Sequence, residues 1–453
     1  MAKWGDLSVI EERLEQPTAR GLANAVGGAI RDGLLVPGAK LPPIRQVAAQ
    51  LHLSPTTVSA GWALLARSGT IRTDGRRGTT VADTAAAPAG RYRRALEGAL
   101  PHRTEFALDL STGVPDPALL PGLADVLPGP LTAGIPGNYL DEPVLPELQE
   151  VLRAEWPYPA GELVVVDGAM DALDLVARTV LRFGDRVAVE NPCFPPLVDL
   201  LEAVGAQLVP LPMDADGVEP DALRETLRTP LAAVVLQPRA QNPTGISTTP
   251  GRAEELAALL AGSGTLVVED DSAGSTAVSP PVSLAPALPE RTVHIRSFSK
   301  SHGPDLRLAA MSGPPDVIGP IVARRQQGQG WSSRLLQRIL HALLTDPTAV
   351  ATVDAARAEY ARRRAAVVGE LAHHGVVVGG TDGINIWVPV LDEAAAIVRL
   401  ASQGVGVTPG GPFTLVPGGP DHIRVTVGLV ADRHVEVGAQ LAAAARTGGW
   451  RAR

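Results

Sequence analysis

The chain has 453 residues, of which 45% are hydrophobic and 19% charged, so an intrinsically disordered protein is excluded and two or three domains are expected. Its single cysteine, Cys193, excludes an internal disulfide and a zinc site built from cysteines. The net charge is −8, no apolar run approaches the roughly 18 residues of a membrane helix, and acids stand near the N-terminus where a signal peptide is apolar. We therefore expect a cytoplasmic protein with no membrane partner and no metal site.

The charge is distributed unevenly along the chain. Residues 1–80 carry ten Lys or Arg and six Asp or Glu, a net +4, which leaves −12 for residues 81–453. A small basic segment attached to a large acidic body is typical of a protein whose basic part meets a polyanion. Compositional scatter would produce the same asymmetry, so the charge alone does not decide between the two.

The first 81 residues are predicted to form three helices followed by a β-hairpin. Apolar residues recur at helical spacing over 18–33 and again over 42–51, and Ser54 is a favourable N-cap for a third helix. The β-prone pieces of 70–81 then flank a basic turn. This order is typical of a winged helix-turn-helix, in which the third helix enters the major groove of DNA and the wing contacts the backbone or minor groove beside it.

Two motifs carry a resemblance to a known family. GLLVPGAKLPPIR at 33–45 and RRGT at 76–79 resemble the winged helix of the GntR family of bacterial regulators. The resemblance implies double-stranded promoter DNA as a partner, contacted by Arg45, Ser54, Thr56, Thr57, Arg76 and Arg77. Pro55 stands where many members have an arginine; proline suits the first turn of a helix, but a hydrogen-bond donor is lost.

Residues 82–106 have no pattern of a buried strand and are predicted to be a linker to a second domain, 107–453. In that domain short apolar strands alternate with helical segments, which is typical of an α/β fold with a mainly parallel sheet covered by helices. Ligands bind such sheets at the carboxyl ends of the strands. Polar residues follow four predicted strands, at 167–169, Asn242, Asp270 and 297–300.

The lysine content narrows the choice of cofactor. The chain has three lysines, and Lys300 is the only one beyond residue 40. No P-loop and no GxGxxG motif follows a strand, so neither ATP nor a dinucleotide is indicated. Pyridoxal 5'-phosphate (PLP) requires an amine for a Schiff base, a carboxylate beside its ring nitrogen, and a cation with backbone N–H groups for its phosphate. Lys300, one acid of 269–271, Arg307 and a helix start at 168–170 would supply these groups.

Three motifs, QNPTG at 241–245, EDD at 269–271 and SFSKSHGPDLR at 297–307, together resemble the fold-type I PLP-dependent aminotransferases over about 107–440. The resemblance implies a smaller C-terminal α/β subdomain and favours Asp270 as the acid that pairs with the ring nitrogen. It implies that Lys300 forms the Schiff base and that Asn242 binds the ring oxygen O3′. It further implies a ring contact from Phe194, a phosphate site from Gly168, Ala169, Met170, Ser297, Ser299 and Arg307, and a carboxylate-binding Arg424.

Two features extend or qualify this resemblance. Tyr139 is similar to a tyrosine that reaches the phosphate bound by a neighbouring subunit, which implies a homodimer. Ser272 stands where many relatives have a tyrosine that binds O3′, and a serine is too short for that bond, so Asn242 would hold O3′ largely alone.

A GntR-type winged helix fused to an aminotransferase-like domain resembles the MocR (GabR-like) subfamily of transcriptional regulators. The implied function is a regulator whose second domain senses PLP, an amine or an amino-acid-like effector, with little or no transaminase turnover. Two alternatives remain open from the sequence: a true aminotransferase with a vestigial N-terminal domain, and a DNA-binding protein whose second domain only dimerises.

Overall fold

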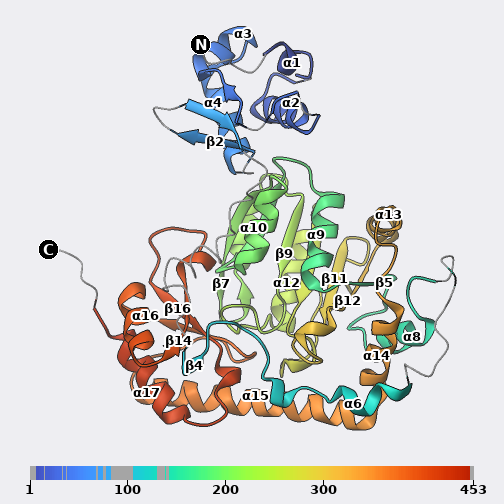
Figure 1. Cartoon of the computed structure of the whole chain (residues 1–453), viewed down its shortest axis with the longest axis vertical. Helices are drawn as coiled ribbons and strands as arrows, with labels where there is room; N and C mark the ends of the chain where they lie inside the picture. The colour runs from blue at the N-terminus through green and yellow to red at the C-terminus, as the bar shows by residue number, and fades with distance from the viewer. Residues whose placement is uncertain are drawn as a thin grey trace. The chain divides into compact units, whose positions relative to one another are not determined.

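The computed structural model describes residues 7–14, 16–32, 34–36, 38–67, 70–74, 78–82, 106–129, 138 and 142–448 (Figure 1). Contacts divide the chain into two compact units, the first comprising residues 1–90 with 181–186 and 198–208, and the second the remaining residues. The predicted linker falls almost entirely outside the described residues. Among the helices that the structure describes, none is both long and apolar enough to cross a bilayer.

The N-terminal module contains the three expected helices and the hairpin. These are α2 (Ala19–Arg31), α3 (Ile44–Gln50), α4 (Pro55–Arg67), β2 (Ile71–Asp74) and β3 (Gly78–Val81). The Ser54 hydroxyl accepts a hydrogen bond from the Thr57 N–H at 3.0 Å and so caps α4, as the sequence predicted. Val58, Trp62 and Leu65 of α4 are buried in one hydrophobic cluster with α2, α3 and the hairpin.

Two short elements of this module were not predicted. Helix α1 (Ser8–Glu11) precedes the bundle, and β1 (Lys40–Leu41) pairs antiparallel with β3, giving the sheet order β1-β3-β2. Neither is long enough to produce a periodic pattern in the sequence. The two strands of the predicted wing therefore belong to a three-stranded sheet in which β3 is central.

The second domain is built around an eight-stranded sheet with helices on both of its faces. The order along the sheet is β5 (Glu162–Val166), β12 (Ala309–Gly313), β11 (Thr292–Ser297), β10 (Leu266–Asp271), β9 (Ala233–Leu236), β6 (Arg186–Asn191), β7 (Gln207–Asp214) and β8 (Gly217–Val218). Strands β6, β9, β10 and β11 pair in parallel, whereas β12 is antiparallel to both β11 and β5. The sheet is thus mixed but mainly parallel, and the predicted α/β fold class is confirmed.

Helices connect the strands and cover the sheet. They are α6 (Leu123–Val126), α8 (Pro146–Ala154), α9 (Ala169–Val180), α10 (Pro195–Ala203), α11 (Pro220–Thr226), α12 (Pro250–Ala261), α13 (Pro315–Gln326) and α14 (Arg334–Thr345). Because β5, β9, β10 and β11 run in the same direction, their carboxyl ends meet at one edge of the sheet. The segments that follow these ends carry the predicted cofactor residues.

A smaller C-terminal subdomain follows the long helix α15 (Pro347–His373), drawn in orange in Figure 1. It consists of an antiparallel sheet, a parallel pair and two helices: β13 (Ile386–Pro389), β16 (His422–Val425), β15 (Thr408–Pro409), β14 (Val405–Gly406) with β4 (Leu108–Asp109), α16 (Glu393–Ser402) and α17 (His434–Ala445). Ala349 of α15 lies in a core cluster of the larger subdomain, and Val367 and Leu371 lie in that of the smaller one. Helix α15 therefore joins the two cores.

Candidate functional site

A cavity of about 270 Å³ lies at the carboxyl ends of the parallel strands. It is lined by nine of the predicted ligand-binding residues: Ala169, Met170, Phe194, Asn242, Ser297, Ser299, Lys300, Arg307 and Arg424. Gly168 and Asp270 lie directly behind this lining, as their contacts below show. Among these nine, residues that are up to 255 positions apart in the chain, from Ala169 to Arg424, thus line one cavity.

Lys300 follows β11 and turns its amine into the cavity. The Nζ atom donates a hydrogen bond to the carbonyl oxygen of Gly113. Burial is the main cause that lowers the pKa of Lys300 to about 8, and the charge of Arg424 is the second. The charge of Asp270 has the opposite effect and raises this pKa. About a tenth of the amine is therefore neutral at pH 7, and the neutral amine is the form that attacks a carbonyl carbon.

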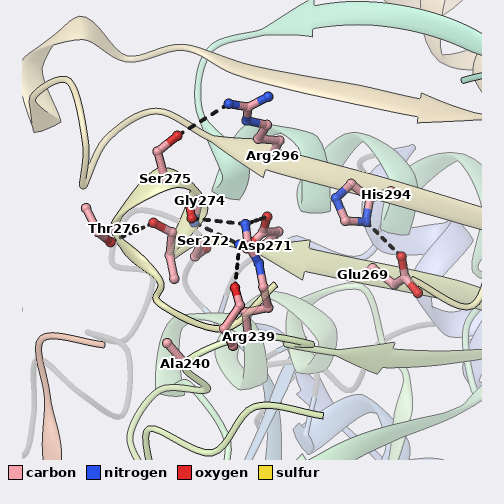
Figure 2. A network of polar contacts seen from close by, with 12 residues as sticks. Arg239, Ala240, Glu269, Asp271, Ser272, Gly274, Ser275, Thr276, His294 and Arg296 are labelled. Carbon is pink, nitrogen blue, oxygen red and sulfur yellow. Dashed lines mark hydrogen bonds and ion pairs between the residues drawn. The ribbon is translucent and has the colours of Figure 1, made fainter. Parts of the chain in front are cut away.

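Two of the three acids at the end of β10 are engaged by basic side chains (Figure 2). Glu269 lies 2.7 Å from the Nδ1 atom of His294 and is fully buried. Asp271 forms a buried ion pair with Arg239, with 2.5 Å between Oδ2 and Nη2. Since successive side chains of a strand point to opposite faces, Asp270 faces the other way from both neighbours.

The Asp270 carboxylate is held from both sides by neutral donors. The Gln237 Nε2 atom donates to Oδ2 at 2.8 Å, and the Ser272 hydroxyl donates to Oδ1 at 2.5 Å. Burial raises the pKa of Asp270, and these two hydrogen bonds oppose that rise because they favour the ionised form. The Ser272 hydroxyl therefore contacts the acid, a role that its sequence position did not predict.

Asn242 has an unsatisfied atom in this cavity. Its backbone N–H donates to the Gln237 Oε1 atom at 3.0 Å, whereas its side-chain Oδ1 atom is buried and has no hydrogen-bond partner within the described part of the chain. A buried polar atom left unpaired costs about 1–3 kcal/mol. The amide is thus placed where a bound molecule would satisfy it, and Gln237 links it to Asp270.

The other end of the cavity has the features of a phosphate site. Gly168 has φ +103°, and a Cβ atom there would lie 3.4 Å from Nη2 of Arg307. Arg307 Nη2 also lies 3.4 Å from the carbonyl oxygen of Asp167. Helix α9 begins at Ala169, so its first N–H groups lie beside this guanidinium, an arrangement that favours an anion. Buried Arg325 pairs with Asp167 at 3.2 Å and offsets its negative charge.

Arg424 is almost fully buried on β16. It donates through Nη2 to the Ser111 carbonyl oxygen and, at 3.0 Å, to the Thr408 hydroxyl, and its guanidinium carbon lies 5.3 Å from the centre of the Phe413 ring. A Cβ atom on Gly113 would lie only 3.2 Å from its Nη1 atom, so glycine there leaves room for the guanidinium. These contacts fix a cation on the cavity wall, near Lys300.

Taken together, the described residues fit PLP. An amine, an unsatisfied amide and a cationic helix start line one cavity of suitable size, and the clamped carboxylate of Asp270 lies directly behind that lining. Gln237, Gly113 and Thr408 were not predicted. Gln237 could have been predicted from the sequence, because it is a polar residue that directly follows strand β9. Gly113 and Thr408 could not, because they act through contacts with Lys300 or Arg424 from distant parts of the chain.

In the N-terminal module, Arg45 is exposed on α3, and Ser54 and Thr56 are exposed at the start of α4. Thr57 is half-buried, and its hydroxyl lies 2.8 Å from that of Ser54. These two hydroxyls therefore contribute to the helix cap as well as to any DNA contact. Arg76, Arg77 and Tyr139 lie outside the described residues.

Replacing Ser272 with alanine tests the clamp on Asp270. Losing the hydroxyl should raise the pKa of Asp270 further, weaken its pairing with a protonated ring nitrogen, and lower PLP affinity by about tenfold, since a hydrogen bond to a charged group contributes about 1.5–3 kcal/mol. Fluorescence titration of the cofactor-free protein measures the affinity. Ser275→Ala, three residues further along the same turn, is the matched control; equal affinities for both variants would show that the Ser272 bond is unimportant for the cofactor.

Comparison with known proteins agrees with both parts of the chain. The family of bacterial regulatory proteins named gntR matches residues 18–81, and the family of class I and II aminotransferases matches residues 108–440. PtsJ of Salmonella typhimurium, a vitamin B6 salvage pathway transcriptional repressor, is 33% identical over 431 residues, covering 93% of this chain and 97% of PtsJ. The HTH-type transcriptional regulator TauR of Rhodobacter capsulatus is 28% identical and covers 90% of each chain.

Among solved structures, a kynurenine aminotransferase of Pyrococcus horikoshii superimposes with a TM-score of 0.71 at 23% identity, covering 79% of this chain and 94% of the enzyme. At that identity the likeness shows the fold alone. PtsJ and TauR, which match over nearly their full length, are both named as regulators, and the predicted family is confirmed. The chain belongs to the MocR subfamily of GntR-type transcriptional regulators, in which a winged helix precedes a class I and II aminotransferase domain.

Proposed function

We propose that this regulator binds promoter DNA through its winged helix and holds PLP in the cavity around Lys300, so that ligand occupancy of the second domain controls DNA binding. The observation that carries the proposal is a cavity lined by Lys300 and Asn242, with Asp270 directly behind its wall, in a chain that also has a capped recognition helix. We propose that the winged helix comprises residues 1–81, the linker 82–106 and the ligand-binding domain 107–453. A protein that binds promoter DNA would act in the cytoplasm.

Each residue has a distinct role in this proposal. PLP, when bound, supplies an aldehyde that combines with amines and a ring that withdraws electrons. Lys300 provides the amine, Asp270 holds a proton on the ring nitrogen, and the Asn242 side chain binds the ring oxygen. Phe194 contacts the ring. Gly168, Ala169, Met170, Ser297, Ser299 and Arg307 bind the phosphate, and Tyr139 would complete the site from the second subunit of a homodimer.

The sensed ligand that we favour is PLP itself, because PtsJ is named for the vitamin B6 salvage pathway. Arg424 adds a second possibility, since its guanidinium lies on the wall of the same cavity and suits the carboxylate of an amino-acid-like effector. Such an effector would displace Lys300 and change the population of conformations of the second domain. DNA-binding affinity measured by fluorescence anisotropy should therefore change at least threefold on addition of PLP, and an unchanged affinity with every ligand would contradict the proposal.

The wing arginines give a prediction for DNA. Arg76→Ala and Arg77→Ala should each weaken binding to all sequences and lower the slope of log affinity against log salt by about 1, because each removes one phosphate contact. Arg45→Ala should also relax sequence preference if that side chain reaches a base. Arg178→Ala, which removes an exposed cation paired with Asp174 on α9, is the control. Unchanged slopes for both wing variants would place the wing away from the DNA.

The alternative function is transamination, which the presence of Lys300, Asp270 and Arg424 in one site favours. Combination with an amine needs only a nucleophile and a displaced Lys300, whereas turnover also needs Lys300 returned as a positioned base. We expect a cognate amine to shift the cofactor absorption spectrum while release of keto acid stays negligible. Arg424→Ala should weaken the shift for amino acids and leave it intact for plain amines. Sustained release of keto acid over many turnovers would favour the enzyme.

A further inference from the structure

A second cavity, of about 360 Å³, lies on the opposite face of β10 and β11 from Asp270. Asp271, His294 and Arg296 line it, and they belong to the face of these strands that points away from the cofactor cavity. Its apolar walls come from the end of α14 and the first turns of α15, with Leu343, Val350 and Val353. The cavity is large enough for a small organic molecule.

Two arginines, Arg296 and Arg357, contact Ser275 at this cavity, and Figure 2 shows the contact of Arg296. Arg296 Nη2 lies 3.3 Å from the Ser275 hydroxyl oxygen, and Arg357 Nε donates to the Ser275 carbonyl oxygen at 2.8 Å. Two guanidinium groups held beside the same residue repel each other, and an anion between them relieves this repulsion. In the described part of the chain, the Nη1 atoms of both arginines make no hydrogen bond, so donors remain for a ligand.

The acids that pair with these arginines can be displaced. Glu155 lies 2.8 Å from Arg296, but its side chain is 44% exposed while that of Arg296 is 11% exposed. Asp354 lies 3.0 Å from Arg357 and is 58% exposed. Ion pairs with exposed acids contribute only about 0–1 kcal/mol, because water and salt screen them. A ligand carboxylate with an apolar body would gain the same charge contact and in addition bury its body.

We propose that this cavity is a second ligand site, which takes a small carboxylate with an apolar body and binds its carboxylate between Arg296 and Arg357. The third arginine of the cavity, Arg239, already uses four of its five N–H donors on Asp271 and on the carbonyl oxygens of Gly274 and Ser279, so it offers a ligand fewer donors than Arg296 and Arg357 do. The ligand body contacts Leu343, Val350 and Val353.

The site is also placed to influence the cofactor cavity. Arg239 lines both cavities, and its partner Asp271 directly follows Asp270 in β10. A carboxylate bound beside this pair should therefore change PLP affinity, and by linkage PLP should change the affinity for the carboxylate by the same factor. This coupling depends on the proposed PLP site, whereas binding of the carboxylate does not.

Benzoate is a suitable probe, and isothermal titration of the full-length protein measures its binding. We expect saturable binding that benzamide, its neutral analogue, does not show. Arg296→Met and Arg357→Met should each weaken benzoate binding at least tenfold. Val350→Trp, which fills the cavity mouth from a 40% exposed position and leaves both arginines in place, should do the same.

Two control variants separate this site from others. Arg362→Met removes an arginine paired with Glu359 further along α15, outside the cavity, and should leave binding unchanged. Arg424→Ala should also leave it unchanged; a loss in this variant alone would place benzoate in the cofactor cavity and overturn the proposal, as would equal binding of benzamide or no saturable binding. PLP affinity with and without saturating benzoate tests the coupling, and equal values would overturn the coupling alone.

Discussion

Replacing Lys300 with alanine should abolish covalent attachment of PLP completely. In the wild-type protein, borohydride should fix the cofactor to the peptide that contains Lys300, because its amine faces the cavity and is the only lysine amine beyond residue 40. The variant should lose the label in mass spectrometry and bind PLP only through its phosphate and ring contacts. Its DNA binding should persist but no longer respond to PLP.

The controls for this experiment address charge and position. Lys300→Arg keeps a cation that can donate to the Gly113 carbonyl oxygen but has no amine to attach, so it too should carry no label. Lys40→Ala, in β1 of the N-terminal module, should be labelled like the wild type. Label found on Lys40 or Lys3 in the wild-type protein would overturn the site.

The lowered pKa of Lys300 adds a pH dependence to the same experiment. Attachment requires the neutral amine, so its rate at low PLP concentration should rise about tenfold for each step of one pH unit below 8 and level off above it. Stopped-flow absorbance of the cofactor-free protein measures this rate. A rate that kept rising to pH 10 would mean that the amine is not buried with Arg424 beside it.

The sequence predicted those parts of the molecule that have local patterns. Ser54 as a cap, the order of helices in the N-terminal module and the polar residues after strand ends are all local, and the structure has them where they were expected. The direction of strand β12 (Ala309–Gly313) could not be predicted in this way. The strand is antiparallel to its neighbours, and a short apolar run in the sequence does not reveal the direction of a strand in a sheet.

The missing parts of the site depend on contacts between distant segments. Ser272 was expected to be too short for the ring oxygen, but nothing local indicated that its hydroxyl would turn to Asp270. Gly113 accommodates Arg424, which is 311 residues away in the chain, and supplies the carbonyl oxygen that Lys300 contacts. Such contacts follow from the packing of the two subdomains, which periodicity and motifs do not describe.

Glu190 provides the second large expected effect, on stability. It is the penultimate residue of β6, a buried carboxyl group whose Oε1 atom accepts a hydrogen bond from the Gln237 N–H at 3.0 Å. Burial raises the pKa of Glu190 from 4.5 to about 8, hydrogen bonds from Gln237 and Gln241 oppose the rise, and the nearby Asp270 adds to it. The group is therefore neutral in the folded protein at pH 7, while it is ionised in the unfolded chain.

This difference makes the folded protein less stable as pH rises. Below pH 4.5 Glu190 is protonated in both states and costs nothing; between 4.5 and about 8 only the unfolded chain releases the proton, so the free energy of unfolding falls. One pKa unit corresponds to about 1.36 kcal/mol, which gives a loss on the order of 5 kcal/mol by pH 8. Replacing Glu190 with a residue that does not titrate should therefore restore much of the lost free energy of unfolding.

We therefore expect Glu190→Gln to raise the free energy of unfolding of the cofactor-free protein by several kcal/mol at pH 8, with little change at pH 4.5. The amide retains an oxygen for the Gln237 N–H and has no charge to lose to water. Urea unfolding followed by circular dichroism at the two pH values measures the effect, and Glu254→Gln on the exposed face of α12 is the control for the same substitution without burial. If Glu190→Gln were instead equally destabilising at both pH values, Glu190 would be ionised in the folded protein, and Asp270 would have a second negative charge beside it rather than a neutral neighbour.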